Sequence, residues 1–334
     1  MIAVLPYVIH PKTAVLGRAG GGNQASQQVA IGFDGYLGRS AVDTRGSEST
    51  AEAIQAEGVG FGVFGNHTAS DETTPAYGQN LFKNQQVTYS SENTKWEYTP
   101  VKYWPAAGHI DFLAYAPYVK QKTLSGTKFD FTVSNNVADQ IDLLWANAAN
   151  QTKANNSGKN KVNFTFKHAL AKIGYSVTST NNDASTTITV KSIKLVGDLV
   201  NENTKAFYTK GTIDLSKADN KANDLWTTAS DDTKQNFTLL SDKPLSTEYK
   251  PTDYLFVIPQ DFSGTANHLY VVVEYTVTTG ESVITNKVSK EISKNFEQGK
   301  AYMINLIIGL TPIEFEATFE SWPTDESIGD FTWN

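Results

Sequence analysis

Short segments in which apolar and polar residues alternate recur along most of this chain. The clearest is the stretch 268–277, where every odd-numbered residue from Leu269 to Val277 is apolar. Alternation of this kind puts the apolar side chains on one face of a β-strand, which then packs inward. Serine, threonine, asparagine, tyrosine and phenylalanine are plentiful, and leucine and alanine form no long helical runs. Many short strands with almost no helix predict an all-β protein built from β-sandwiches.

The length of the chain predicts two domains. Its 334 residues exceed the roughly 250–300 residues that one hydrophobic core organises. A polar break at Thr178–Ser185 separates two stretches that each contain several apolar strands. We therefore predict an N-terminal domain over residues 28–181 and a C-terminal domain over residues 182–334, each with its own core. Residues 1–27 form an N-terminal extension whose origin the sequence does not decide.

Two segments depart from simple alternation. Asp139–Ala149 has apolar residues at i, i+3, i+4 and i+7, which predicts one short amphipathic helix. In the segment 162–177 the apolar residues occupy even positions up to Leu170 and odd positions from Ile173 onward. A change of phase turns the later side chains to the opposite face, so we expect a bulge or kink near Ala171–Lys172.

The segment Gln28–Gly38 has the pattern of a half-buried first strand. Its inward apolar side chains are those of Val29, Ile31, Phe33 and Leu37. The loop Ser40–Glu57 follows, and it is rich in small and polar residues typical of an exposed segment. Arg39 and Arg45 lie at the start of this loop, where a protease can reach them.

Composition excludes several classes of protein. The chain has no cysteine, so it has no disulfide, thiolate zinc site or cysteine nucleophile. Its net charge of −7 argues against nucleic acid as a partner. No apolar run approaches the roughly 18–20 residues of a membrane-spanning helix. Met1–Ile9 lacks a basic start and a small-residue cleavage site, so if the protein is exported we expect its targeting segment to be missing from this sequence.

Catalytic and metal-binding patterns are weak, and we expect no enzyme activity, no metal and no cofactor. There is no GxSxG turn, no phosphate-binding glycine loop and no regular oxygen spacing of a calcium loop. His168 lies in phase with core phenylalanines, which favours a structural, hydrogen-bonded histidine. Glu314 and Glu316 share one strand face, and charges on the solvent side of an edge strand discourage aggregation. The remaining histidines are scattered, without the pairing of a zinc site: His10, His67, His109 and His268.

Trp96, Tyr98 and Trp104 share one face of a predicted strand and allow two interpretations. As an exposed platform they would stack on sugar rings, which would make the chain a surface carbohydrate-binding sandwich. As core residues they would be buried and needed for stability.

Several stretches in the same order resemble the fimbrillin family, the pilin subunits and pilus-associated proteins of anaerobic Gram-negative bacteria. They cover about residues 28–323 and read IGFDGYLGRSAVDTRG with GVGFGVFG, WEYTPVKYWP with IDFLAYAPYV, FTFKHALAKIGYSV, DYLFVIPQ, and FEQGKAYMINLIIGL ending in ATFESWP. The resemblance implies two tandem transthyretin-like β-sandwich domains. It also implies export as a lipoprotein and display on the cell surface, at the outer membrane, in a pilus. The lipid-bearing cysteine of the family pattern is absent from this sequence.

Family resemblance further implies how such a subunit assembles. An arginine-specific protease removes the first strand, and other pilin subunits then donate a C-terminal strand into the vacated groove. For this chain we expect cleavage after Arg45, with Arg39 second, and displacement of the strand that carries Ile31. A host receptor or glycan is a further partner that the family allows.

The donated strand has two candidates within residues 313–334. One carries Ile313, Phe315 and Phe319, and the other is the tail with Phe331 and Trp333. The first candidate fits a permanent strand of the second sandwich equally well. We therefore favour the tail as the donated strand.

Overall fold

The computed structural model describes residues 28–37, 51–70, 72–156, 160–201, 203–217, 225–245, 248–249, 254–312 and 316–321. In these residues helix is confined to α1 (Ala51–Gln55) and to single 3-10 turns at Val137–Asp139 and Asp231–Thr233. Everything else with regular structure is strand, so the all-β prediction is confirmed.

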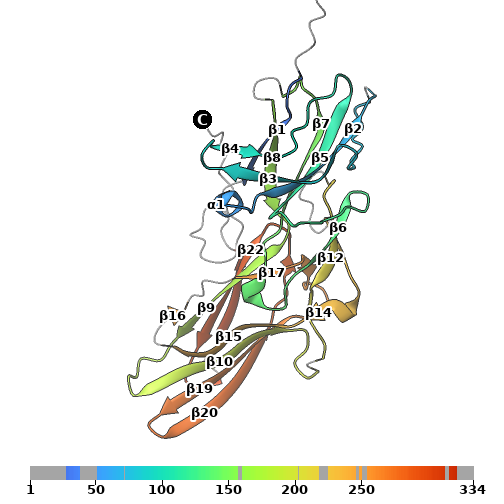
Figure 1. Cartoon of the computed structure of the whole chain (residues 1–334). Coiled ribbons are helices and arrows are strands. Elements are labelled where there is room, and N and C mark those ends of the chain that lie inside the picture. Colours follow the sequence, from blue (N-terminus) through green and yellow to red (C-terminus); the bar gives the residue numbers. More distant parts are fainter. Residues whose placement is uncertain are drawn as a thin grey trace, which may run out of the picture.

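The first part of the chain forms one seven-stranded sheet in the order β1-β8-β7-β5-β2-β3-β4 (Figure 1). Its strands are β1 (Gly32–Leu37), β2 (Phe61–Thr68), β3 (Phe82–Ser90), β4 (Lys95–Glu97), β5 (His109–Ala116), β7 (Leu144–Gln151) and β8 (Lys161–His168). The two ends of this order meet, because Ala30 bridges to Tyr103 just beyond β4. The sheet therefore curls around a single core that is rich in aromatic side chains.

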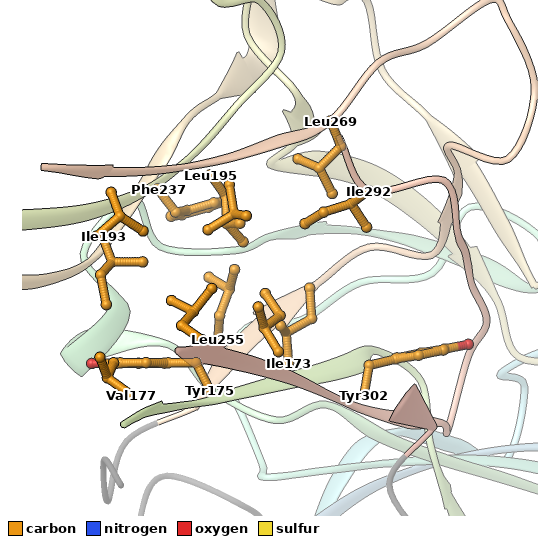
Figure 2. Close-up of a cluster of buried hydrophobic side chains, with 14 of the residues drawn as sticks. Ile173, Tyr175, Val177, Ile193, Leu195, Phe237, Leu255, Leu269, Ile292 and Tyr302 are labelled. Atoms are coloured by element: carbon orange, nitrogen blue, oxygen red, sulfur yellow. The ribbon is translucent and has the colours of Figure 1, made fainter. Parts of the chain in front are cut away.

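The second part consists of two sheets that face each other. One contains β15 (Phe237–Leu245), β10 (Thr186–Val196), β19 (Tyr270–Thr279) and β20 (Ser282–Glu291). The other contains β16 (Glu248–Tyr249), β9 (Ala171–Ser179), β22 (Ala301–Ile308) and β23 (Glu316–Ser321), with β17 (Leu255–Val257) also paired to β9. Figure 2 shows Ile193 and Leu195 of the first sheet facing Tyr175 and Val177 of the second across the core.

A third sheet joins the two parts. β6 (Lys128–Thr132) comes from the first part and pairs antiparallel with β12 (Lys210–Asp214), which pairs in turn with β13 (Trp226–Thr228). A cluster of buried side chains from both parts lies against it, including those of Tyr115, Trp145, Trp226 and Ile258. Two short ribbons complete the strands: β11 (Phe207–Tyr208) with β14 (Lys234–Gln235), and β18 (Gln260–Asp261) with β21 (Asn295–Phe296). The two parts therefore share a core as well as having one each.

The helix predicted at Asp139–Ala149 is wrong. The segment forms the end of a 3-10 turn and then β7, a central strand between β5 and β8. Leu144 packs into the core of the first sheet and Trp145 into the shared cluster on the opposite face. A strand buried on both faces carries consecutive apolar residues, and these imitate helical spacing.

The change of phase near Ala171–Lys172 marks a change of sheet rather than a bulge within one strand. β8 ends at His168, and β9 begins at Ala171 in a different sheet, where it pairs in parallel with β22. β9 therefore lies in the same sheet as strands that follow residue 181, which argues against a domain boundary between residues 181 and 182. The division into two domains stays a prediction, and this pairing moves its expected boundary to Ala169–Leu170.

Candidate functional site

The first strand is held by backbone hydrogen bonds on both sides. From Gly32 onward β1 pairs in parallel with β8, in a register that sets Phe33 beside Val162. Just before it the chain runs antiparallel to residues 102–104: the Ile31 N–H donates to the carbonyl of Lys102 at 2.8 Å, and the Trp104 N–H donates to the carbonyl of Val29 at 2.9 Å. β1 therefore closes the curled sheet between its two ends.

The inward side chains of this strand fill the centre of the aromatic core. Ile31 and Phe33 are each 1% exposed, and Val29 packs partly buried against the same cluster. The ring of Phe33 is surrounded by four aromatic rings with centroids 5.3–5.8 Å away, those of Tyr98, Phe82, Phe112 and Phe164. The predicted inward phase is therefore correct at Ile31 and Phe33. Leu37 lies opposite Phe166 in the backbone register, and its side chain is outside the described residues.

Gly35 occupies the next inward position, and the core leaves little room there. A Cβ at this residue would lie 3.1 Å from the ring of Phe166 and 3.2 Å from the ring of Phe61. The groove under β1 thus has two deep positions, at Ile31 and Phe33, followed by a shallow one at Gly35.

Polar contacts fix the register of the strand. The Tyr98 hydroxyl donates to the carbonyl oxygen of Ile31 at 2.7 Å, and burial raises the pKa of Tyr98, so the hydroxyl stays protonated at neutral pH. On the outward face the carboxylate of Asp34 lies 3.3 Å from the ammonium group of Lys161. Tyr98 is 67 residues from Ile31 in the sequence, and Lys161 is 127 residues from Asp34. No sequence signal identified either residue as a contact of β1.

Other predicted site residues fall elsewhere. Arg39, Arg45, Ile313, Phe315, Phe331 and Trp333 lie outside the described residues. Phe319 lies in β23, which pairs antiparallel with β22, and Ala317 of that strand packs against the core of the second part. In this structure the first donor candidate thus contributes an edge strand to its own subunit.

The aromatic face formed by Trp96, Tyr98 and Trp104 is part of the core. Trp96 is 9% and Trp104 7% exposed, and the ring of Trp96 packs against that of Phe61 at 4.8 Å. Tyr98 is half-buried beside Phe33. Buried rings cannot stack on sugars, so the carbohydrate-platform interpretation is wrong for these residues.

His168 has the structural environment that its phase predicts. Its Nδ1 lies 2.7 Å from a carboxylate oxygen of Asp142, which is fully buried. Within the described part of the chain no three acidic or histidine side chains converge as metal ligands. No helix among those residues is long and apolar enough to cross a membrane.

Comparison with known proteins gives a consistent result. A family model described as fimbrillin-like matches residues 44–322. The fimbrium subunit Fim1C of Phocaeicola vulgatus is 29% identical over an alignment that covers 90% of each chain. The solved structure of a fimbrial protein from Bacteroides vulgatus has 24% identity and a TM-score of 0.65, covering 88% of this chain and 99% of that one. A Bacteroides uniformis structure, at 18% identity and a TM-score of 0.54, covers 88% and 98% and likewise shares the fold.

Proposed function

Because the chain belongs to the fimbrillin-like family, a family of fimbrial subunits, we propose that it is a structural subunit of a cell-surface pilus that assembles by exchange of its first strand. Its partners are then other pilin subunits and an arginine-specific protease, and its site of action is the outer face of the cell. The work of the molecule is assembly and not catalysis.

The observation that carries this proposal is the position of β1. The strand closes the curled sheet through hydrogen bonds on both sides and buries Ile31 and Phe33 in the centre of the core. Its loss would expose two rows of unpaired backbone groups and an apolar groove, which together capture another strand. Each large side chain that such a strand buries contributes roughly 1.5–3 kcal/mol.

The distribution of arginine supports cleavage in the loop after β1. The whole chain has three arginines, Arg18, Arg39 and Arg45, and every other basic residue outside the histidines is lysine. An arginine-specific protease can therefore cut ahead of residue 46 and nowhere in the rest of the chain. A cut after Arg45 or Arg39 separates β1 from the body of the protein, whereas a cut after Arg18 leaves β1 attached.

Cleavage by itself does not release the strand. The hydrogen bonds to β8 and to residues 102–104 remain, as do the buried contacts of Phe33. The cut subunit keeps its groove filled until a stronger strand competes for it, which prevents uncontrolled aggregation.

The experiment treats purified protein with an arginine-specific protease and follows mass and oligomer size together. Wild type should lose its N-terminal segment and form ladders or fibres. The Arg39→Ala/Arg45→Ala variant should stay monomeric, and an Arg18→Ala variant, the matched control, should assemble like wild type. Assembly of the double variant at the wild-type rate would refute the mechanism.

A further inference from the structure

A pocket of about 340 Å³ opens beside the sheet that joins the two parts of the chain. Its walls are residues 119–125, which we call the pocket loop, together with β6 and Thr212 of β12, the strand that lies next to β6 (Figure 1). A volume of this size is in the range of small-molecule sites. None of the lining residues belongs to the core cluster around β1, so the pocket is separate from the groove under that strand.

Hydrogen bonds hold both ends of the pocket loop. At its start the Tyr115 hydroxyl donates to the side chain of Asn84 at 2.7 Å and accepts the N–H of Val119 at 3.2 Å. The Asn84 amide donates in turn to the carbonyl of Val119 at 3.0 Å. At its end Ser125 and Lys128 exchange two backbone hydrogen bonds, of 2.8 and 3.1 Å. A ligand therefore meets a wall that is already formed, and binding does not have to order it.

The middle of the pocket loop has an uncommon backbone conformation. Gln121 has a φ of +64°, in the left-handed region that residues other than glycine, asparagine and aspartate seldom adopt. Such conformations cost free energy and cluster at functional sites. Three consecutive side chains, those of Lys120, Gln121 and Lys122, line the same pocket. An extended strand would turn the middle one to the opposite face, so the left-handed turn is what brings the three together.

Positive charge dominates the lining, although the chain as a whole carries −7. Among the described residues that line the pocket, the ionisable ones are Lys120, Lys122, Lys128 and Asp130. The ammonium group of Lys128 lies 4.0 Å from the carboxylate of Asp214, which leaves Lys120 and Lys122 as the cations for a ligand. A pocket with this balance attracts an anion.

Lys122 is the cation that is best placed to bind an anion. It is half-buried, its Nζ donates to the carbonyl of Asp130 at 3.0 Å, and this nitrogen lies 4.7 Å from the ring centre of Phe129. An ammonium group has three N–H donors, so two remain for a ligand. Burial lowers the pKa of Lys122 despite the nearby charge of Asp130. An anion beside it would favour the charged form, and the attraction is stronger here than in open water.

The rest of the lining suits a ligand with hydroxyl groups. It contains side chains that donate and accept hydrogen bonds, those of Gln121, Thr123, Ser125, Asp130 and Thr212. Apolar lining is limited, because Leu124 and Phe129 are buried. A lipid or aromatic ligand would find little apolar surface to cover, whereas each hydroxyl of a sugar both donates and accepts.

We propose that this pocket binds an acidic sugar, a pyranose ring that carries a carboxylate. The carboxylate lies between the ammonium groups of Lys120 and Lys122, and the ring hydroxyls bond to the polar side chains of the lining. Sialic acids and uronic acids share this chemistry. The inference goes beyond the assembly function and does not depend on it. A fibre built from such subunits would carry one site for acidic glycans on each of them.

Titration calorimetry on the uncleaved monomer tests the ligand. The probes are sodium N-acetylneuraminate and sodium glucuronate, with glucose and acetate as controls that lack the carboxylate and the ring, respectively. At least one acidic sugar should bind ten-fold more tightly than either control, and its affinity should fall as salt is raised. Tighter binding of the sialic acid would indicate host glycans as the source, and tighter binding of glucuronate would indicate uronic acid polysaccharides. Failure of both acids to bind, or equal binding of glucose or acetate, would overturn the inference.

Two matched pairs of lysine substitutions locate the site. Lys120→Gln/Lys122→Gln should weaken binding of the acidic sugar at least ten-fold. Lys287→Gln/Lys290→Gln removes the same charge from exposed positions on β20 and should bind like wild type. An equal loss in both double variants, or no loss in the first, would contradict binding in this pocket.

A further pair tests the shape of the pocket loop rather than its charge. Gln121→Pro cannot adopt a positive φ, because the proline ring fixes φ near −65°, so it should lose at least ten-fold in affinity. Gln121→Asn keeps an amide and tolerates the left-handed region, so it should bind within about three-fold of wild type. Thermal unfolding checks that each variant is folded, and the lysine pairs decide the matter if Gln121→Pro is not. Wild-type affinity in a folded Gln121→Pro variant would refute the site.

Discussion

The Tyr98 hydroxyl donates a 2.7 Å hydrogen bond to the carbonyl oxygen of Ile31 and accepts one of 3.3 Å from the N–H of Lys102. It thereby ties the first strand to residues 102–104, on the side away from β8. Under the proposed exchange, a strand that replaces β1 would need to present a carbonyl at the same point to keep this hydrogen bond.

Tyr98→Phe should therefore loosen β1 without opening the core. The ring contacts with Phe33 and Phe82 remain, and the lost hydrogen bond contributes about 0.5–1.5 kcal/mol net. We expect the cleaved strand to be released roughly 2- to 12-fold faster, measured by the mass of the free N-terminal fragment over time. Tyr89→Phe, on β3 against Trp96, is the control and should release the strand at the wild-type rate. An unchanged release rate in Tyr98→Phe would show that the hydroxyl does not hold the strand.

Phe33→Ala should destabilise the first part of the chain strongly. Removing a fully buried phenylalanine costs about 3–5 kcal/mol, and this ring contacts four others. Ile31→Val should cost about 0.5–1.5 kcal/mol, and the outward Asp34→Ala less than about 1 kcal/mol. Urea unfolding of the intact monomer measures all three. Equal costs for Phe33→Ala and Asp34→Ala would mean that β1 does not fill the core in solution.

Alternation predicts strands well where one face is buried, and it fails at β7, whose first residues are buried on both faces. All odd residues from Leu269 to Val277 lie in the core, as their phase predicts. β7 was predicted as a helix because Leu144 and Trp145 enter two different cores. Sequence also predicted β1 and the inward phase of Ile31 and Phe33. It did not predict the parallel pairing of β1 with β8, since local periodicity carries no information about partners that lie far apart in the chain.

The shared sheet predicts that the two parts stay together when the chain is cut. A protease site inserted after Asn181, between β9 and β10, should give two fragments that elute as one species. The two fragments should separate only when denaturant is added, because β9 pairs with β22 and β6 pairs with β12 across the cut. Size-exclusion chromatography of the nicked protein is the measurement. Fragments that separate in native buffer would contradict the shared core.

We expect Asp214 to make the stability of this junction depend on pH. Burial raises the pKa of its carboxyl, but hydrogen bonds from Ser216 and Thr127 and the charge of Lys128 outweigh burial and lower the pKa below the ordinary 3.8. A lowered folded-state pKa gives stability that is present above the unfolded value, about pH 4, and is lost as pH falls through the folded value. Wild type should therefore lose more stability between pH 5 and pH 3 than Asp214→Asn does, measured by thermal unfolding at each pH. Parallel pH profiles would exclude Asp214 as the cause.

Deleting Ser327–Asn334 separates the two donor candidates. If residues 313–319 enter the groove, the shortened chain keeps all of β23 and its donor pattern, so it should assemble within about two-fold of the wild-type rate. Light scattering after arginine-specific cleavage gives the rate, and electron microscopy checks that the product is a fibre. A matched variant, Phe315→Ser in the full-length chain, should then slow elongation at least ten-fold, because it replaces a large apolar side chain of the donated strand with a small polar one. Its thermal unfolding before cleavage shows whether the monomer is intact. Loss of fibres on deletion, with normal fibres from Phe315→Ser, would assign donation to the tail instead.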